Sequence, residues 1–134
     1  MSAGTNETLL QLSQQLLDAI DTGNWETYQR LCDPSLSAFE PEALGCLVEG
    51  MDFHETYFAN RPVAGSRSST MQNPRVRLTD QSAVVTYIRL IQAISADGQH
   101  SSHAYEETRI WHQVEGDWKH VHFHRSRVGH LSLG

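Results

Sequence analysis

The amino-acid sequence predicts an α+β fold in which helices pack on one face of a curved antiparallel sheet. The first third of the 134-residue chain carries apolar residues at helical spacing, whereas the second half carries alternating patterns separated by short turn signals. Helices that precede sequential strands with short turns are typical of α+β domains. The length is that of one domain, so we expect a single domain over residues 1–134 with its core over about residues 6–126.

A stripe of apolar residues predicts the first helix. Thr5 or Asn6 is a suitable cap for its start, and Gly23 is a suitable residue just after its end. Asn24 can then cap a second, short helix that stops before Pro34. The stripe of the first helix consists of Leu9, Leu12, Leu16 and Ile20, widened by Leu10 and Leu17.

The middle of the chain predicts short elements, and the second half predicts four strands. Residues 36–39 are a candidate strand, residues 41–45 a turn or a single helical turn, residues 51–59 a helix, and residues 60–69 an exposed loop. Turn signals at residues 79–81, 96–98 and 115–117 separate the strands, which makes them an antiparallel meander. The four strands are predicted at residues 70–79, 82–94, 103–114 and 118–125.

Each of the last three strands places an arginine among apolar side chains, because side chains alternate between the two faces of a strand. Buried charge is costly without partners. If the three faces are one face, they line a cavity whose guanidinium groups would bind a carboxylate bidentately. Alternatively, each arginine extends to solvent at a strand end or pairs with a core acid such as Glu107. The three sets are Val85, Tyr87, Arg89 and Ile91; Tyr105, Glu107, Arg109 and Trp111; and Lys119, Val121, Phe123 and Arg125.

Other patterns give weaker signals. The alternating residues His120, His122 and His124 of the last strand resemble a metal-binding arrangement, but nearby carboxylate ligands are not evident, and a hydrogen-bonding ladder at an interface explains them better. We therefore expect no metal. Asp52 beside His54 is conceivable as an acid–base pair, although an acidic residue at a helix N-terminus explains Asp52 equally well. The sequence contains no phosphate-binding loop and no kinase signature, so the chain is not itself a kinase.

Composition excludes several classes of partner. The chain has 10 Lys and Arg against 16 Asp and Glu, with a net charge of −6 and a pI near 5.7, which argues against nucleic acid. No apolar run approaches a membrane span, and the N-terminus lacks the basic region of a secretory signal, so we expect no membrane partner. The two cysteines, Cys32 and Cys46, fit reduced thiols and a cytoplasmic location.

Four segments closely resemble the association, or hub, domain of calcium/calmodulin-dependent protein kinase II. They are LCDPSLSAFEPEALGCLVEGMDFHETYF (residues 31–58), YIRLIQ (87–92), EETRIWH (106–112) and WKHVHFHRS (118–126). Their order and spacing match this family from about residue 9 to residue 126. The resemblance implies the cone-shaped nuclear-transport-factor-2-like (SnoaL-like) fold, in which a long N-terminal helix packs on a strongly bent antiparallel sheet that encloses a pocket.

The resemblance also implies an oligomer. Hub domains pair into dimers through their sheets, and the dimers assemble into two stacked rings of six or seven subunits each, a dodecamer or a tetradecamer. The hub catalyses nothing, needs no cofactor, and brings attached kinase domains together. The loop after Asn60 and the segment at residues 95–103 differ in character from kinase hubs. Whether this chain forms a ring or stops at a dimer therefore stays open.

The resemblance further implies a pocket for a small carboxylate. The positions that match the family's pocket are His54, Arg89, Arg109 and Arg125, with Tyr57, Tyr87, Tyr105 and Glu107 expected as neighbours. Isomerases and dehydratases share this fold, so the alternative function is a small-molecule enzyme of the SnoaL-like or ketosteroid-isomerase-like kind. His54 would be its base, since an arginine keeps its proton at ordinary pH.

Overall fold

The computed structural model describes residues 2–60 and 65–129. Three α-helices, one short 3-10 helix and six strands follow one another along the described chain, in the predicted order of helices first and long strands later. They are α1 (Ser2–Thr22), α2 (Trp25–Leu31), β1 (Cys32–Phe39), η1 (Pro41–Ala43), β2 (Val48–Glu49), α3 (Asp52–Asn60), β3 (Ser66–Leu78), β4 (Ser82–Ile94), β5 (His100–Val114) and β6 (Asp117–Arg127).

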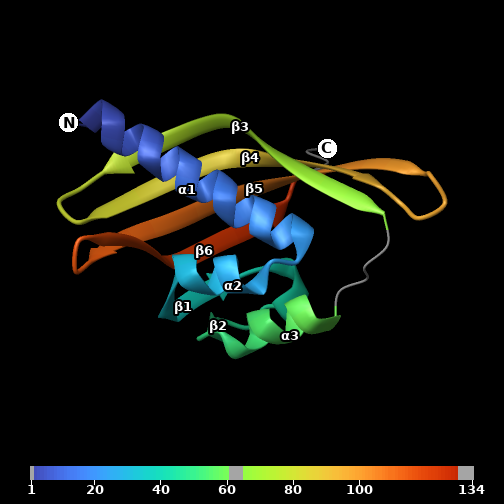
Figure 1. The fold of residues 1–134 in the computed structure, drawn as a ribbon, viewed down its shortest axis with the longest axis horizontal. Coiled ribbons are helices and arrows are strands. Elements are labelled where there is room, and N and C mark those ends of the chain that lie inside the picture. The colour runs from blue at the N-terminus through green and yellow to red at the C-terminus, as the bar shows by residue number, and fades with distance from the viewer. Residues whose placement is uncertain (1, 61–64, 130–134) are drawn as a thin grey trace, which may run out of the picture.

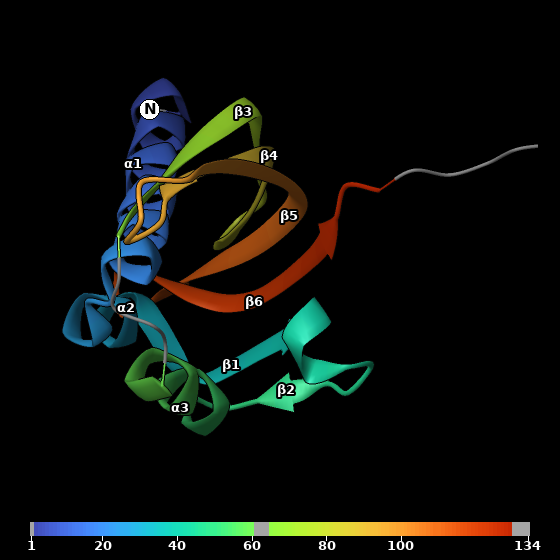
Figure 2. The same cartoon turned by 90° about the vertical axis from the view of Figure 1, so that its right-hand side faces the viewer.

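The strands form one sheet in the order β2-β1-β6-β5-β4-β3, and the helices lie on its concave side (Figures 1 and 2). The meander from β3 to β6 is antiparallel, as predicted. The sequence did not predict that β1 lies beside β6, where the two strands run parallel. The predicted α+β class is therefore confirmed, with one parallel pair inside an otherwise antiparallel sheet.

Helix α1 crosses the inner face of the sheet, where its leucine stripe enters the core (Figure 1). Leu9, Leu16 and Leu17 are fully buried. The indole nitrogen of Trp111, at the centre of the core, donates a hydrogen bond to Ser13 Oγ at 3.2 Å. The predicted start at Thr5 or Asn6 is wrong, because α1 already begins at Ser2. Gly4 has a low helix propensity, but no proline precedes the expected cap, and the helix includes residues 2–4.

Local sequence signals set most of the remaining boundaries. The side chain of Asn24 accepts a hydrogen bond from the Thr27 amide at 3.1 Å and caps α2, as predicted. Strand β1 starts directly after α2 and includes Pro34, which lies where the pairing with β6 is irregular. The β5–β6 turn places Glu115 and Gly116 at φ 53° and 85°, the left-handed values that a tight hairpin requires.

Strand β3 begins earlier than predicted. Residues 66–69 were expected in an exposed loop, but they pair with β4, from Ser66 opposite Ile94 to Ser69 opposite Ile91. Their serines lack the apolar alternation that identifies a strand in a sequence. The segment is therefore recognisable as a strand only from its pairing with β4. The rest of that loop, residues 61–64, lies outside the described residues.

The convex face of the sheet carries no described helix (Figure 2). Its side chains are the strand residues that alternate with the core residues, and they are half-buried although no element covers them. This outer face is defined here by Val84, Thr86, Ile88 and Leu90 of β4, Thr108 and Ile110 of β5, and His122 of β6. Among the described helices, none is long and apolar enough to cross a membrane.

Candidate functional site

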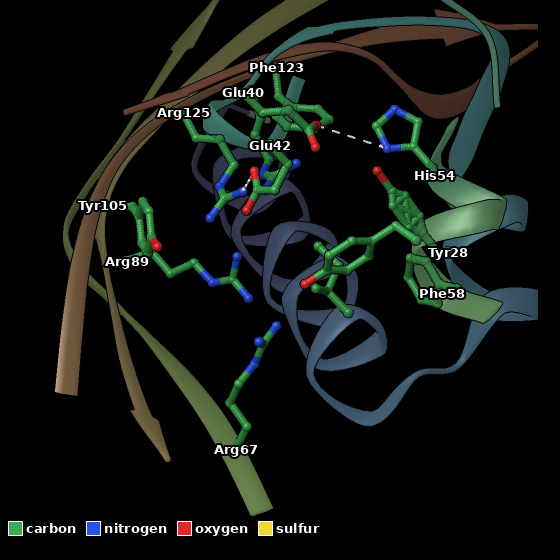
Figure 3. A pocket seen from close by; sticks show the side chains of 13 residues that line it. Tyr28, Glu40, Glu42, His54, Phe58, Arg67, Arg89, Tyr105, Phe123 and Arg125 are labelled. Atoms are coloured by element: carbon green, nitrogen blue, oxygen red, sulfur yellow. Dashed lines mark hydrogen bonds and ion pairs between the residues drawn. The ribbon is translucent and has the colours of Figure 1, made fainter. Parts of the chain in front are cut away.

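A cavity of about 100 Å³ lies between the inner face of the sheet and the helices (Figure 3). Six of the eight residues predicted for the pocket line it, namely His54, Tyr57, Arg89, Tyr105, Arg109 and Arg125. The other two, Tyr87 and Glu107, are buried directly behind the arginines and do not line this cavity. The remaining lining residues are Phe123, which strand alternation placed on the face of Arg125, and six that the sequence reasoning missed, namely Ile20, Tyr28, Glu40, Glu42, Phe58 and Arg67.

Strand register brings the predicted residues together. On β4 every second side chain is buried, which puts Tyr87 and Arg89 on the inner face. Strand β5 places Glu107 opposite Tyr87 on one side and opposite Arg125 of β6 on the other. Glu107 therefore lies at the centre of the inner face, between residues from both neighbouring strands.

Glu107 is the common partner of the three predicted arginines. Its carboxylate oxygens lie 3.3 Å from Arg89 Nη1, 3.0 Å from Arg109 Nη2 and 3.3 Å from Arg125 Nε. It also accepts a hydrogen bond from the Tyr87 hydroxyl at 2.7 Å. Burial alone would raise the pKa of Glu107, but the Arg109 and Arg89 charges lower it to about 2, so this carboxylate is ionised at neutral pH. The sequence left two alternatives for the three arginines, a shared cavity or pairing with a core acid such as Glu107. In the structure they line one cavity and also pair with Glu107.

Arg109 is the most buried of these cations, with 1% of its side chain exposed. Besides the Glu107 contact, its Nε donates to the Tyr87 hydroxyl at 2.7 Å and its Nη1 lies 3.3 Å from His120 Nε2. Its guanidinium also lies over the Phe123 ring, 4.6 Å from the ring centroid. These contacts fix the guanidinium plane against the inner wall of the cavity.

The structure corrects the predicted faces of β6. Trp111 pairs with His120 and Ile110 pairs with His122, so Val121 has no partner and forms a bulge. The bulge turns His120 inward and fully buries it, and Lys119 and Val121 do not join Phe123 in the core. The alternating histidines therefore do not share one face. In residues 2–60 and 65–129, no group of three or more potential metal ligands occurs.

The contacts of His120 define its protonation state. A guanidinium N–H can only donate, so His120 Nε2 must accept the hydrogen bond from Arg109. The ring proton is then on Nδ1, which points to Cys32 Sγ at 3.5 Å. Burial, together with the Arg109 charge, holds the pKa of His120 well below its ordinary value. His120 is therefore a neutral group that positions Arg109 without adding charge.

A second acid reaches the cavity wall from α1. Asp21 Oδ1 accepts hydrogen bonds from Arg89 Nη2 at 2.9 Å and from Arg67 Nε at 2.8 Å. Arg89 Nε donates in addition to Ser69 Oγ at 2.9 Å. The sequence could have placed Asp21 on the inner side of α1. It follows the buried residue Leu17 by four positions, so the two side chains lie on the same face of the helix.

The opposite wall of the cavity is aromatic and holds a histidine–carboxylate pair (Figure 3). His54 stacks on Tyr28, with ring centroids 5.8 Å apart, and its Nδ1 lies 4.0 Å from Glu40 Oε2. Burial and the Arg109 charge lower the pKa of His54 to about 4. Burial, and next the charge of Glu42, raise the pKa of Glu40 to about 7. A histidine with so low a pKa is a weak base, which disfavours the alternative that His54 acts as a catalytic base.

An ion pair forms a partly exposed side of the cavity wall. Arg125 Nη1 donates to Glu42 Oε1 at 2.7 Å, and the Arg125 guanidinium lies 4.4 Å from the centroid of the Tyr105 ring. The Glu42 side chain is 36% exposed, compared with 12% for Arg125, so the acid lies on the solvent side of the arginine. The cavity thus combines a cationic wall on the sheet with an aromatic wall on the helices.

The chain matches the family model of the calcium/calmodulin dependent protein kinase II association domain over residues 5–129. It is 43% identical over 136 residues to the type II alpha chain of this kinase from Drosophila melanogaster, covering 98% of this chain and 25% of that protein. It is 45% identical over 123 residues to subunit delta from Oryctolagus cuniculus, covering 90% of this chain and 23% of that protein. The chain therefore spans about a quarter of the length of these relatives.

Solved structures give the same assignment. The hub homology domain of Chlamydomonas reinhardtii is 47% identical with a TM-score of 0.83, covering 90% of this chain and 96% of that one. The association domain of C. elegans is 39% identical with a TM-score of 0.85, covering 92% and 96%. A nuclear transport factor 2-like protein from Salmonella enterica is 17% identical with a TM-score of 0.83, covering 100% and 98%, which shows the fold alone. The chain therefore belongs to the family of calcium/calmodulin-dependent protein kinase II association domains, with a nuclear-transport-factor-2-like fold.

Proposed function

We propose that this chain is a hub whose outer face docks on the outer face of a second copy, and that such dimers build two stacked rings of six or seven subunits. Association domains of this kinase family are non-catalytic oligomerisation hubs, which agrees with the prediction that the chain is not an enzyme. The observation that carries the proposal is the uncovered outer face, where Ile88, Leu90 and Ile110 meet solvent without a described helix over them.

The curated relatives are about four times longer than this chain and are named as kinases. We accordingly propose kinase domains as the partners that the assembled hub brings together, with no role for nucleic acid or a membrane. The compartment that we propose is the cytoplasm, because Cys32 and Cys46 are both free thiols.

An Ile110→Glu substitution tests the proposed dimer. Ile110 lies in the middle of the outer face, between Val84 of β4 and His122 of β6. In a two-fold interface the new carboxylate would be buried twice without a charged partner, because the lowered pKa of the neighbouring His122 favours its neutral form, at a cost of several kcal/mol per charge. We expect light scattering at micromolar concentration to show the oligomer for the wild type and a monomer for Ile110→Glu.

The matched control is Val114→Glu, which also replaces a β-branched residue of β5 by glutamate but lies at the turn beside β6. Val114 is already 37% exposed, so we expect this variant to stay oligomeric. Circular dichroism should show that both variants are folded. A wild-type chain that is monomeric at micromolar concentration would contradict the proposal.

We also propose that the cavity binds a small carboxylate. Arginines on the sheet side supply charge-assisted hydrogen bonds, and the aromatic wall formed by Tyr28, His54 and Phe58 can pack against an apolar tail. We expect butyrate to raise the unfolding temperature, because a ligand at one hundred times its dissociation constant stabilises the folded state by about 2.7 kcal/mol. Butyramide, which has nearly the same shape without the charge, is the control. Equal shifts with the two compounds, or none with butyrate, would refute carboxylate binding.

A further inference from the structure

Arg67 is a cavity-lining arginine that the alternation of the last three strands could not reveal, because it lies on β3. Its side chain is 28% exposed, whereas those of Arg89 and Arg109 are 2% and 1% exposed. Asp21 holds its Nε, and the guanidinium extends from β3 toward Arg89 (Figure 3). Arg67 therefore has the most exposed side chain of the four arginines that line the cavity, since that of Arg125 is 12% exposed.

The four arginines of the cavity wall face only three carboxylates, because Arg67 shares Asp21 with Arg89, which also pairs with Glu107. Each of the other three arginines forms an ion pair with at least one of three carboxylates, so three positive charges face three negative ones. The two groups on the aromatic wall add no charge at pH 6, because the pKa of His54 is about 4 and that of Glu40 is about 7. The matched arginines are Arg89, Arg109 and Arg125, and the matched carboxylates are those of Asp21, Glu42 and Glu107.

We propose that Arg67 supplies the surplus positive charge by which the cavity selects a small monoanion over a neutral molecule or a dianion. This inference rests on the proposed carboxylate-binding function and assigns the residue that determines its specificity. A single surplus charge in a site of low dielectric constant is compensated by one carboxylate, whereas a second carboxylate on the ligand would be buried without a partner. Asp21 fixes the Arg67 side chain, so the guanidinium is oriented before the ligand enters.

The test measures ligand affinity by titration calorimetry at pH 6, on the full chain, with butyrate, butyramide and succinate as probes. For the wild type we expect butyrate to bind more tightly than either of the other two. For Arg67→Gln we expect butyrate affinity to fall about 10- to 100-fold, the effect of losing hydrogen bonds to a charged group. Arg67→Lys keeps the positive charge but lacks the planar guanidinium that binds a carboxylate through two N–H groups. For this variant we expect an intermediate loss of butyrate affinity.

The matched control is Arg75→Gln, the same substitution on the same strand at an exposed position, where we expect wild-type affinity. The NMR signal of the Arg67 Nε–H group in the wild type provides a second measurement that requires no variant, and we expect butyrate to shift it. If the wild type binds butyrate but Arg67→Gln binds it equally well, or if succinate binds more tightly, the inference is overturned and the carboxylate function stands. If the wild type binds no butyrate, the carboxylate function itself fails.

Discussion

Replacing Glu107 by glutamine is expected to lower the free energy of unfolding by about 3–5 kcal/mol, because it removes one partner of a buried ion-pair network. Arg89 would keep Asp21 and Arg125 would keep Glu42. Arg109 is buried, and Glu107 is its ion-pair partner among the described residues, so its charge would be left buried and uncompensated. Urea denaturation at constant protomer concentration measures the loss, since assembly also contributes to stability.

A second substitution distinguishes charge from packing at this site. Adding Arg109→Met to Glu107→Gln removes the uncompensated cation, so the double variant should be more stable than the single one. If the single variant were as stable as the wild type, or if Arg109→Met brought no recovery, Glu107 would not be the group that neutralises the inner face.

The pH dependence of Glu107 has a definite sign. Its pKa is lowered from 4.5 to about 2 in the folded state, so the stabilisation is complete above about pH 5 and is lost as the pH falls through 2. The wild type should therefore lose stability between about pH 5 and pH 2 by this contribution, and Glu107→Gln should lack it. Acid titration of the unfolding free energy of both proteins measures the difference.

Carboxylate affinity is expected to fall about tenfold between pH 6 and pH 8 because of Glu40. Burial raises the pKa of Glu40 to about 7, and a ligand carboxylate would enter the same cavity. Only the protonated form of Glu40 avoids repulsion, and its fraction falls from about 0.9 at pH 6 to about 0.1 at pH 8. Binding therefore takes up a proton, and affinity decreases as the pH rises. His54, with a pKa of about 4, stays neutral over this range.

Calorimetric titration with butyrate at three pH values, in two buffers of different ionisation enthalpy, measures both the affinity and the proton uptake. Glu40→Gln should bind butyrate equally well at pH 6 and pH 8, without proton uptake. Glu49→Gln, an exposed position on β2, should keep the wild-type profile. If Glu40→Gln retains the wild-type pH dependence, another group couples binding to protons.

Much of this arrangement follows from local sequence rules. Strand β4 was predicted at its observed bounds, and alternation along β4 and β5 placed Arg89, Glu107 and Arg109 on the inner face. There the two arginines line one cavity, and Glu107 is buried behind them as their shared ion-pair partner. These rules succeed because both strands pair without interruption, so the two-residue period of their side chains holds throughout.

The failures have physical causes that alternation cannot express. The bulge at Val121 changes the face of His120, and a bulge depends on how two strands pair rather than on either strand alone. Arg67 lies in a serine-rich segment that has no strand pattern of its own. Glu40 enters the cavity through the parallel pairing of β1 with β6, a contact between distant segments that no short-range pattern encodes.

The pairing of β1 with β6 also has a consequence for how the protein folds during synthesis. Ser37 of β1 bonds to His122, 85 residues later in the chain, and at about 5–20 residues per second the ribosome needs about 4 to 17 s to cover that distance. During this delay the nascent β1 has only the two-residue strand β2 beside it, so its other edge is unpaired, and Glu40, just after it, lacks the arginine wall. The cavity can close only when the last strand emerges, so translation speed and chaperone protection should govern the yield of native hub.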